Sequence, residues 1–260
     1  MMAQYRGYLI DLDGTVYQGK TRIPAAQRFI ARLQENEIPF LFVTNNTTKK
    51  PAEVVANLAH NHNIYVQEAN VYTAGMATAE YLQDDAEQRG LPLTANVIGE
   101  PDLKNLISQA GFDVFANDPA YVVAALDYDL TYEKVAQAAL AIQKGARFIG
   151  TNADTLIPTE RGKLPGAGSI IELLRYATQV DPVLIGKPND LIIKNAIKLL
   201  QLPADQVVMV GDNYQTDIKA GMKAGIDTIL VYTGVSKREQ VQKEERQPTH
   251  EIESFDDWQI

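Results

Sequence analysis

The chain has 260 residues, of which 45% are apolar and 22% charged, as is ordinary for a globular protein. Its 24 lysines and arginines against 33 acidic residues leave a net charge of −9, which argues against nucleic acid and anionic lipid as partners. It contains no cysteine, so disulfides, thiolate metal sites and cysteine nucleophiles are excluded. No apolar run approaches the roughly 18 residues of a membrane span, and no signal core follows the N-terminus. We therefore expect a cytoplasmic protein without a membrane partner.

Short apolar runs alternate with helical patterns in the first part of the chain. The expected elements are a strand at 8–10, a helix at 24–34, a strand at 40–43 and a helix at 51–58. Pro24 stands where the first turn of a helix tolerates proline. His60 and His62 come after the second helix with no carboxylate cluster beside them, so we interpret both as surface residues.

The middle of the chain repeats this alternation with elements of its own. The expected elements are strands at 96–98, 121–126 and 147–149 and helices at 103–110 and 133–143. These are enough for a separate layer, so we predict an inserted α/β domain at 77–180. The core domain would then comprise 1–76 plus 181–260. The glycine-rich segment 166–169 is interpreted as tight packing at a helix start, with a phosphate cradle as the alternative.

The last third returns to apolar strands and helices. The expected elements are a strand at 183–185, a helix at 190–200, a strand at 207–210, a helix at 217–223 and a strand at 228–231. The charged stretch 237–250 is expected to form a surface helix or loop, with Phe255 and Trp258 anchoring the end. Fully apolar strands that alternate with helices predict an α/β fold with a doubly wound parallel sheet covered on both faces.

Ligands of open parallel sheets bind at the carboxyl ends of the strands, so the residues after each apolar run are the candidates for chemistry. Polar residues follow four runs, namely Asp11 and Asp13, Thr44 with Asn45 and Asn46, Lys187, and Asp212 with Asp217. We expect four strands of one sheet to bring these side chains together. Each motif alone has an ordinary explanation: a turn for Asp13, a solvated side chain for Lys187, a helix N-cap for Thr216. Their joint occurrence favours a site.

The chemistry of this set follows from its charges. Several aspartates close together repel one another, and a hard divalent cation such as Mg²⁺ relieves the repulsion. The cation and Lys187 would then present positive charge to an anion, and Thr44 would offer a hydroxyl. A carboxylate that is free to attack this anion indicates phosphoryl transfer.

The same residues carry a family resemblance. Residues 11–16, 43–46, 186–188 and 211–217 resemble the first to fourth motifs of the haloacid dehalogenase (HAD) superfamily of phosphohydrolases. Residues 72–79, 145–152 and 229–235 are similar to its subfamily IIA, the NagD-like, 4-nitrophenylphosphatase type. That branch carries an α/β cap of the C2 type, inserted between the second and third motifs of a Rossmann-like core.

The resemblance implies a role for each matched residue. Asp11 would be the nucleophile that forms an aspartyl-phosphate, and Asp13 the general acid and then the base. Mg²⁺ would be bound by the Asp11 side chain, the Asp13 backbone carbonyl and Asp212, with Asp217 acting through water. The phosphoryl group would be held by Thr44, Asn45, Asn46 and Lys187, and Lys187 would also offset the charge of Asp11.

The inserted domain would cover the strand ends and select the substrate. Asn152, Asp154 and Thr155 follow an expected strand and are candidates to face the substrate; an Asx turn without ligand contact is the alternative. The resulting hypothesis is a Mg²⁺-dependent phosphomonoesterase for small phosphorylated metabolites such as sugar phosphates, nucleoside monophosphates and 4-nitrophenyl phosphate. A phosphomutase or phosphotransferase on the same scaffold and a non-catalytic metabolite-binding regulator are the alternatives. A homo-oligomer is compatible with the sequence.

Overall fold

A computed structural model describes residues 5–159 and 161–260. The chain divides into two compact units. The first, here called the core unit, consists of Met1–Thr44, Pro51–Tyr72 and Lys187–Ile260. The second, the inserted unit, consists of Asn45–Lys50 and Thr73–Gly186. None of the described helices is long and apolar enough to cross a membrane.

The core unit is built on a six-stranded sheet with the strand order β14-β13-β12-β1-β4-β5. Its strands are β1 (Gly7–Ile10), β4 (Phe40–Thr44), β5 (Val71–Thr73), β12 (Val207–Gly211), β13 (Asp227–Val231) and β14 (His250–Ile252). The central strand β1 is buried along its whole length and pairs in parallel with β12 and β4. The β12–β13 and β13–β14 ladders are parallel as well. Their carboxyl ends therefore share one edge of the sheet.

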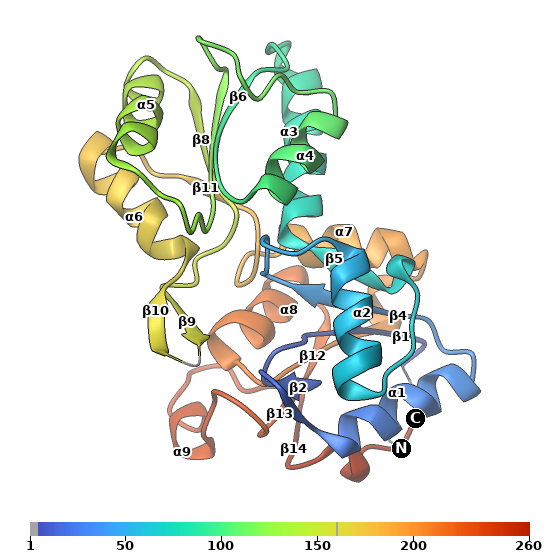
Figure 1. The fold of residues 1–260 in the computed structure, drawn as a ribbon. Helices are drawn as coiled ribbons and strands as arrows, with labels where there is room; N and C mark the ends of the chain where they lie inside the picture. The colour runs from blue at the N-terminus through green and yellow to red at the C-terminus, as the bar shows by residue number, and fades with distance from the viewer. Residues whose placement is uncertain (1–4, 160) are drawn as a thin grey trace. The chain divides into compact units, whose positions relative to one another are not determined.

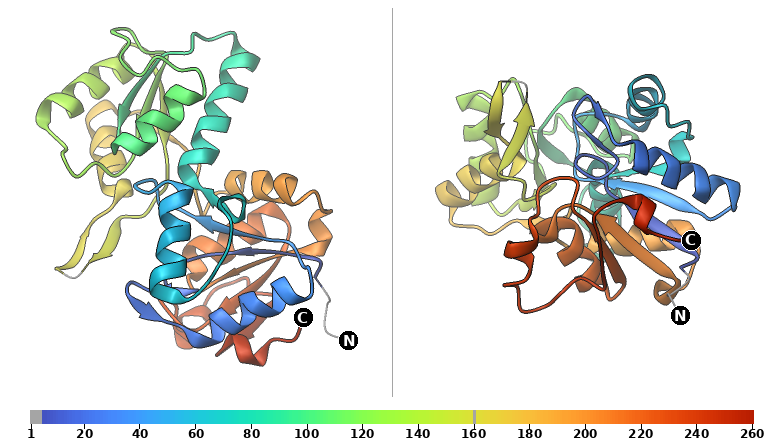
Figure 2. Two further views of the ribbon diagram at one scale, coloured as in Figure 1. Left: turned by 45° about the vertical axis from the view of Figure 1, so that its right-hand side comes forward. Right: turned by 90° about the horizontal axis from the view of Figure 1, so that it is seen from below.

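Helices cover both faces of this sheet, as Figures 1 and 2 show. The helices are α1 (Pro24–Glu35), α2 (Pro51–His62), α7 (Leu191–Leu200), α8 (Lys219–Ala224) and α9 (Arg238–Val241). Helix α1 buries Phe29, Ile30 and Leu33 at helical spacing in one cluster with Tyr8 of β1. Helix α7 contacts β1 and β4, and α8 contacts β13. The doubly wound parallel core expected from the sequence is confirmed.

The predicted aromatic anchors at the C-terminus are also confirmed. Phe255 is 1% exposed and stacks on Phe29 with the ring centroids 4.8 Å apart. Trp258 is 4% exposed, and its indole Nε1 donates a hydrogen bond to the Tyr8 hydroxyl at 3.2 Å. The last residues are thus tied to the helix and strand at the start of the core.

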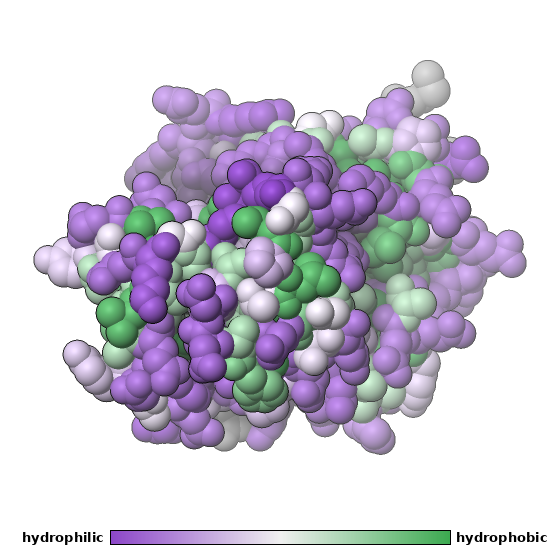
Figure 3. Space-filling model, turned by 90° about the horizontal axis from the view of Figure 1, so that it is seen from above, coloured by the Kyte–Doolittle hydropathy of each residue, from purple (hydrophilic) through white to green (hydrophobic). Residues whose placement is uncertain are grey.

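The inserted unit contains a separate parallel sheet with the order β11-β8-β7-β6. Its strands are β6 (Ala95–Ile98), β7 (Tyr121–Ala124), β8 (Arg147–Gly150) and β11 (Val183–Leu184), and its helices are α3 (Ala74–Arg89), α4 (Pro101–Gln109), α5 (Tyr132–Gln143) and α6 (Ala167–Thr178). Helices α5 and α6 pack together, and so do α3 and α4 (Figure 1). A hairpin of β9 (Leu156–Thr159) and β10 (Gly162–Pro165) precedes α6. On the face drawn in Figure 3, hydrophilic residues predominate and hydrophobic residues form small groups.

The strand expected at 183–185 does not belong to the core sheet, which corrects the prediction. Val183 and Leu184 form β11, which pairs with Ile149 and Gly150 of β8. An apolar run predicts a strand but does not specify its partner, and this short strand, with Val183 exposed and Leu184 half-buried, can join either sheet. Lys187 therefore follows a strand of the inserted unit, and three core strands rather than four lead into the candidate site.

Three further details of the sequence-based prediction are corrected by the structure. The helix expected at 217–223 is present as α8, but it begins earlier than expected, with a π-helical turn, η3 (Tyr214–Ile218). Asn213, not Thr216, caps this turn, since its side chain accepts a hydrogen bond from the Gln215 amide at 3.0 Å. His60 is exposed as expected, but His62 is only 2% exposed. Its ring stacks on Tyr17 of a short hairpin, β2 (Tyr17–Gln18) and β3 (Thr21–Arg22), at a centroid distance of 4.4 Å.

Candidate active site

Three parallel core strands deliver polar residues to one edge of the sheet. Asp11 follows β1, Thr44 ends β4, and Asp212 follows β12. The Asp11 amide continues the β1–β12 ladder by donating to the carbonyl of Val210 at 2.9 Å. Asp11, Thr44 and Asp212 are 9%, 8% and 1% exposed, respectively. The parallel register, and not sequence proximity, brings these side chains to one edge.

Lys187 is a buried cation at the centre of this group. It is 1% exposed, and its Nζ donates to Asp11 Oδ1 at 2.6 Å, to the carbonyl of Val43 at 2.7 Å, and pairs with Asp217 Oδ1 at 2.8 Å. These contacts match the three N–H donors of an ammonium group. Burial lowers the pKa of Lys187, but the charges of Asp11 and Asp217 outweigh it and raise the pKa above its ordinary value. The side chain is therefore held as a fixed positive charge.

Three carboxylates lie close to one another, and two of them contact this single cation. Asp11, Asp212 and Asp217 each offer an oxygen, and these oxygens lie within 4.8 Å of one another. Burial and then the charge of Asp11 raise the pKa of both Asp212 and Asp217 above the ordinary carboxyl range. Lys187 offsets one of the three charges, so buried negative charge is left uncompensated. Clustered hard oxygen donors with excess negative charge fit a divalent cation.

Thr15 links Asp11 and Asp212, and the sequence argument assigned it no role. Its Oγ1 donates to Asp212 Oδ1 at 2.9 Å, lies 3.3 Å from Asp11 Oδ2, and accepts from the Asp212 amide at 3.0 Å. Gly14 precedes it with φ +95°, and a Cβ there would lie 2.5 Å from Asp212 Oδ2. Gly14 and Thr15 lie within the motif at residues 11–16, and this position was the signal that could have identified them as part of the site.

Asp13 differs from the other aspartates because it is exposed. Its Oδ1 accepts a hydrogen bond from the Gly19 amide at 3.2 Å, and its backbone bridges to Tyr17. It is not a member of the carboxylate cluster identified among the described residues. The structure thus places a solvent-accessible carboxylate two residues after the buried Asp11.

The polar residues after β4 fall in different units. Thr44 belongs to the core unit, whereas Asn45 and Asn46 belong to the inserted unit. The Asn45 side chain donates to Asp154 Oδ2 at 3.1 Å. Asn46 Oδ1 accepts from the amide and the hydroxyl of Thr48 at 2.7 and 2.9 Å, which is the geometry of a local turn. Of these three predicted residues, only Thr44 belongs to the same structural unit as Asp11, Asp212 and Asp217.

Asn152 and Asp154 form a compact hydrogen-bonded loop in the inserted unit. Asn152 Nδ2 donates to the carbonyl of Asn45 at 2.9 Å, and Asn152 Oδ1 accepts from the Asp154 amide at 3.1 Å. The Asx turn given as the alternative is therefore present, and contact with substrate stays a prediction. Gly166 and Gly168 pack against this loop, since a Cβ at either would lie 2.3 or 2.6 Å from the carbonyl oxygen of Asp154 or Ala153. Tight packing at the start of α6 is confirmed.

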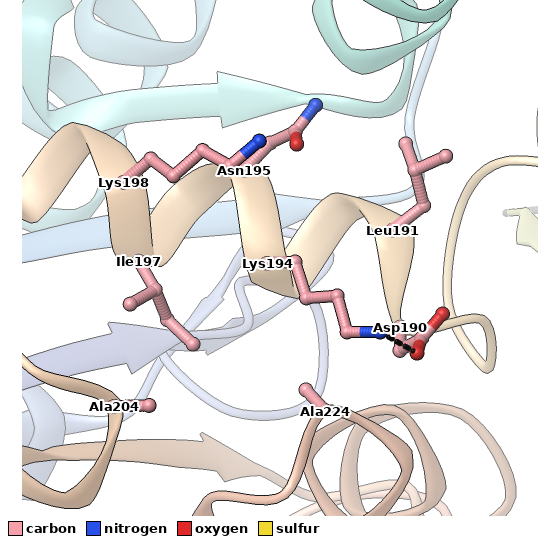
Figure 4. A pocket seen from close by; sticks show the side chains of 8 residues that line it. All are labelled: Asp190, Leu191, Lys194, Asn195, Ile197, Lys198, Ala204 and Ala224. Atoms are coloured by element: carbon pink, nitrogen blue, oxygen red, sulfur yellow. Dashed lines mark ion pairs between the residues drawn. The ribbon is translucent and has the colours of Figure 1, made fainter.

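A groove in the core unit lies apart from these residues. It has a volume of about 420 Å³ and runs beside α7, as Figure 4 shows. Its lining residues are Asp190, Leu191, Lys194, Asn195, Ile197, Lys198, Ala204 and Ala224. Lys194 at its rim is paired with Asp190 at 2.6 Å. None of the predicted site residues lines this groove, so the candidate site is the polar cluster at the strand ends.

Two family models match the chain. Residues 8–113 match a family described as haloacid dehalogenase-like hydrolase, and residues 184–258 match one described as HAD-hydrolase-like. Among curated relatives, the chain is 44% identical to the 5'-nucleotidase YutF of Bacillus subtilis over 99% of this chain and 98% of that protein. It is 43% identical to the acid sugar phosphatase of Staphylococcus haemolyticus over 98% of this chain and 95% of that protein.

Solved structures resemble the fold over nearly its whole length. A single mutant of the thermostable NPPase from Geobacillus stearothermophilus superimposes with a TM-score of 0.92 at 41% identity, covering 99% of each chain. NagD from E. coli K-12 gives a TM-score of 0.91 at 28% identity, covering 98% of this chain and 99% of that one. The likeness therefore includes both units.

Proposed function

Because the chain belongs to the haloacid dehalogenase-like hydrolases and is a phosphoric monoester hydrolase of the NagD-like, 4-nitrophenylphosphatase type, we propose that it is a Mg²⁺-dependent phosphomonoesterase that works through an aspartyl-phosphate on Asp11. The observation that carries this proposal is the buried ion pair of Lys187 and Asp11 beside two further carboxylates. An ionised carboxylate held this way is a competent nucleophile only when the charge of its target is neutralised.

Asp11 begins the reaction. One of its carboxylate oxygens forms a bond to phosphorus while the bond between phosphorus and the leaving oxygen breaks. Lys187 holds Asp11 Oδ1 at 2.6 Å, which limits rotation of the carboxylate and offsets its charge. Thr44, Asn45 and Asn46 would join Lys187 in binding the phosphoryl oxygens. A nucleophile oriented in this way saves much of the entropy of the encounter.

Asp13 acts as the general acid and then as the general base. Its exposed carboxyl group protonates the leaving oxygen and then accepts a proton from water. That water attacks phosphorus, the bond to Asp11 breaks, inorganic phosphate leaves, and Asp11 is regenerated. Correctly placed general acid–base catalysis contributes about 10²–10⁴-fold to such steps.

The proposed metal site uses Asp11, the backbone carbonyl of Asp13, Asp212 and the nearby Asp217. A Mg²⁺ ion bound there would neutralise charge on the phosphoryl oxygens. The raised pKa values of Asp212 and Asp217 are consistent with this assignment, because burial and the charge of Asp11 together outweigh the opposing charge of Lys187.

Small phosphorylated metabolites are the proposed substrates. The Bacillus relative is named a 5'-nucleotidase and the Staphylococcus relative an acid sugar phosphatase, which supports nucleoside monophosphates and sugar phosphates as the classes to test. In this proposal the inserted unit selects among them, with Asn152 and Asp154 facing the leaving group. A phosphomutase or a non-catalytic regulator on the same scaffold would differ in whether free phosphate appears.

The test measures phosphate release from 4-nitrophenyl phosphate and a metabolite panel, with Mg²⁺ and with excess chelator. Acid quenching during turnover of a substrate that is radiolabelled in its phosphoryl group should leave labelled phosphate on the wild-type protein. The same label should appear on the control variant Asp205→Asn, which changes an exposed aspartate, but not on Asp11→Asn. Full turnover in chelator would remove the metal from the mechanism. Label on Asp11→Asn would remove Asp11 as the nucleophile, and substrate conversion without free phosphate would favour the mutase.

A further inference from the structure

The loop after β13 forms hydrogen bonds with Asp212, and the proposed mechanism gives the residues of this loop no role. The amide of Val235 donates to Asp212 Oδ2 at 2.7 Å, and the amide of Ser236 donates to the Asp212 carbonyl at 3.2 Å. Thr15 binds the other carboxylate oxygen at 2.9 Å. Both oxygens of Asp212 are therefore fixed by donors from two different loops, one after β1 and one after β13.

A single side chain ties these two loops together. Thr233 Oγ1 donates to the carbonyl of Gly14 at 2.6 Å. Strands β1 and β13 are not neighbours, because β12 lies between them in the sheet. The hydrogen bond therefore crosses over the end of β12, where Asp212 is located.

The loops that contain Gly14 and Gly234 pack closely against the Asp212 carboxylate. A Cβ at Gly234 would lie 2.1 Å from Asp212 Oδ2 and 2.9 Å from the Cα of Gly14. A Cβ at Gly14 would meet the same carboxylate from its own side at 2.5 Å. The Asp212 carboxylate is thus packed between two glycines whose loops are joined by Thr233.

We propose that Thr233 is a positioning residue for the metal site, because its hydroxyl keeps the Gly14 and Gly234 loops closed around Asp212. The inference rests on the proposed function, since it assumes that Asp212 helps to hold the divalent cation. Without this clamp, repulsion from Asp11 would let Asp212 turn away, and the cation would have to restore the arrangement when it binds. Partners that orient metal ligands in this manner typically contribute about 10–100-fold to metal affinity.

The test compares three variants. Thr233→Val removes the hydroxyl at nearly constant volume, Thr233→Ser restores it, and Thr228→Val removes a buried hydroxyl from β13 itself. Thr228 is 0% exposed and hydrogen-bonds with Thr249, so it reports the stability cost of losing a threonine hydroxyl. The readouts are Mn²⁺ binding without substrate, by electron paramagnetic resonance, and the Mg²⁺ concentration that gives half of the metal-induced rise in Tm.

Thr233→Val is expected to weaken both metal readouts by about 10-fold, with kcat recovering at high Mg²⁺. Thr233→Ser should bind metal nearly as the wild type does, and Thr228→Val should lose Tm but keep its metal affinity. If Thr233→Val binds metal like the wild type while the wild type responds to Mg²⁺, the inference is wrong and the proposed function stands. A wild type that binds neither ion would overturn both.

If Thr233→Val unfolds, Gly234→Ala in the same loop replaces it, because the added Cβ would lie 2.1 Å from Asp212 Oδ2. It should also weaken metal binding about 10-fold. Unchanged metal binding in folded Gly234→Ala would show that the loop does not position Asp212.

Discussion

Each unit contains a cluster of ionised groups around a buried aspartate, but the ratio of positive to negative charge differs between the two clusters. In the core unit one lysine faces three carboxylates, and the pKa values of Asp212 and Asp217 are raised. In the inserted unit Asp85 is 7% exposed and pairs with Arg89 at 2.9 Å and Arg147 at 2.7 Å.

Hydrogen bonds add to these ion pairs in the second cluster. The hydroxyl of Tyr121 donates to Asp85 Oδ2 at 2.9 Å. Burial raises the pKa of Asp85, but the hydrogen bonds from Arg89 and Tyr121 and the charge of Arg147 lower it below its ordinary value. The comparison teaches that a cluster whose negative charge is matched by arginines needs no further ion, whereas a cluster with excess negative charge is suited to binding a cation and, with it, an anionic ligand.

The largest difference between the clusters should appear in turnover. Asp11→Asn keeps the size of the side chain but removes the nucleophile, so kcat should fall by at least about 10³-fold. Asp85→Asn, in the balanced cluster, should retain most of the kcat per folded molecule. Steady-state hydrolysis of 4-nitrophenyl phosphate measures both. A tenth of the wild-type kcat in Asp11→Asn would contradict the role of Asp11.

Exposed Asp13 should show an effect that depends on the leaving group. An alkyl alcohol needs protonation as it leaves, whereas 4-nitrophenolate leaves readily without it. Asp13→Asn should therefore cost about 10²–10⁴-fold on a sugar phosphate and clearly less on 4-nitrophenyl phosphate. The measurement is the ratio of kcat/KM on the two substrates, and equal losses would argue against a leaving-group acid.

Replacing an aspartate by asparagine should change the free energy of unfolding differently in the two clusters. Asp85→Asn leaves Arg147 without its full partner, so the free energy of unfolding should fall by about 2 kcal/mol. Asp212→Asn in excess chelator removes repulsion from Asp11, so its free energy of unfolding should equal or exceed that of the wild type. Urea unfolding of both variants decides this. A matching loss in Asp212→Asn would show that the hydrogen bonds accepted by the two Asp212 oxygens outweigh the repulsion from Asp11.

The smallest expected effect is the pH dependence of that stability. Between the ordinary carboxyl pKa, near about 4, and the raised native values of Asp212 and Asp217, the native state binds more protons than the unfolded chain. Their contribution to the stability of the metal-free protein therefore falls as pH rises through this window. Saturating Mg²⁺ should reverse the sign, because the cation binds the ionised carboxylates in competition with protons.

The lowered pKa of Asp85 works in the other direction. Its stabilisation is present above the ordinary carboxyl pKa and is lost as pH falls through the lower native value. Urea unfolding as a function of pH, for the wild type and for Asp85→Asn, with and without Mg²⁺, separates the two contributions. If Mg²⁺ leaves the slope of the metal-free protein unchanged, the core carboxylates do not bind it.

Local patterns in the sequence were sufficient to predict much of the fold and the strand ends at which the candidate site lies. The apolar runs that became β1, β4 and β12 each lead into a polar residue, and parallel strands bring such residues to one edge. The spacing of Phe29, Ile30 and Leu33 predicted helix α1, since one face of a helix repeats every 3.6 residues. These features depend on neighbours in the chain, which a sequence displays directly.

Tertiary structure alone decided which distant groups meet. Val183 and Leu184 read as a strand of either sheet, and only their pairing with β8 assigns them to the inserted unit. The sequence predicted a surface position for His62, whereas in the structure Tyr17 stacks on its ring and covers it. The balance of charge around Lys187 depends on Asp11, which is 176 positions away in the chain. Burial and Coulomb energy follow distances in space, so a local sequence pattern can supply the charged groups but cannot show whether they are compensated.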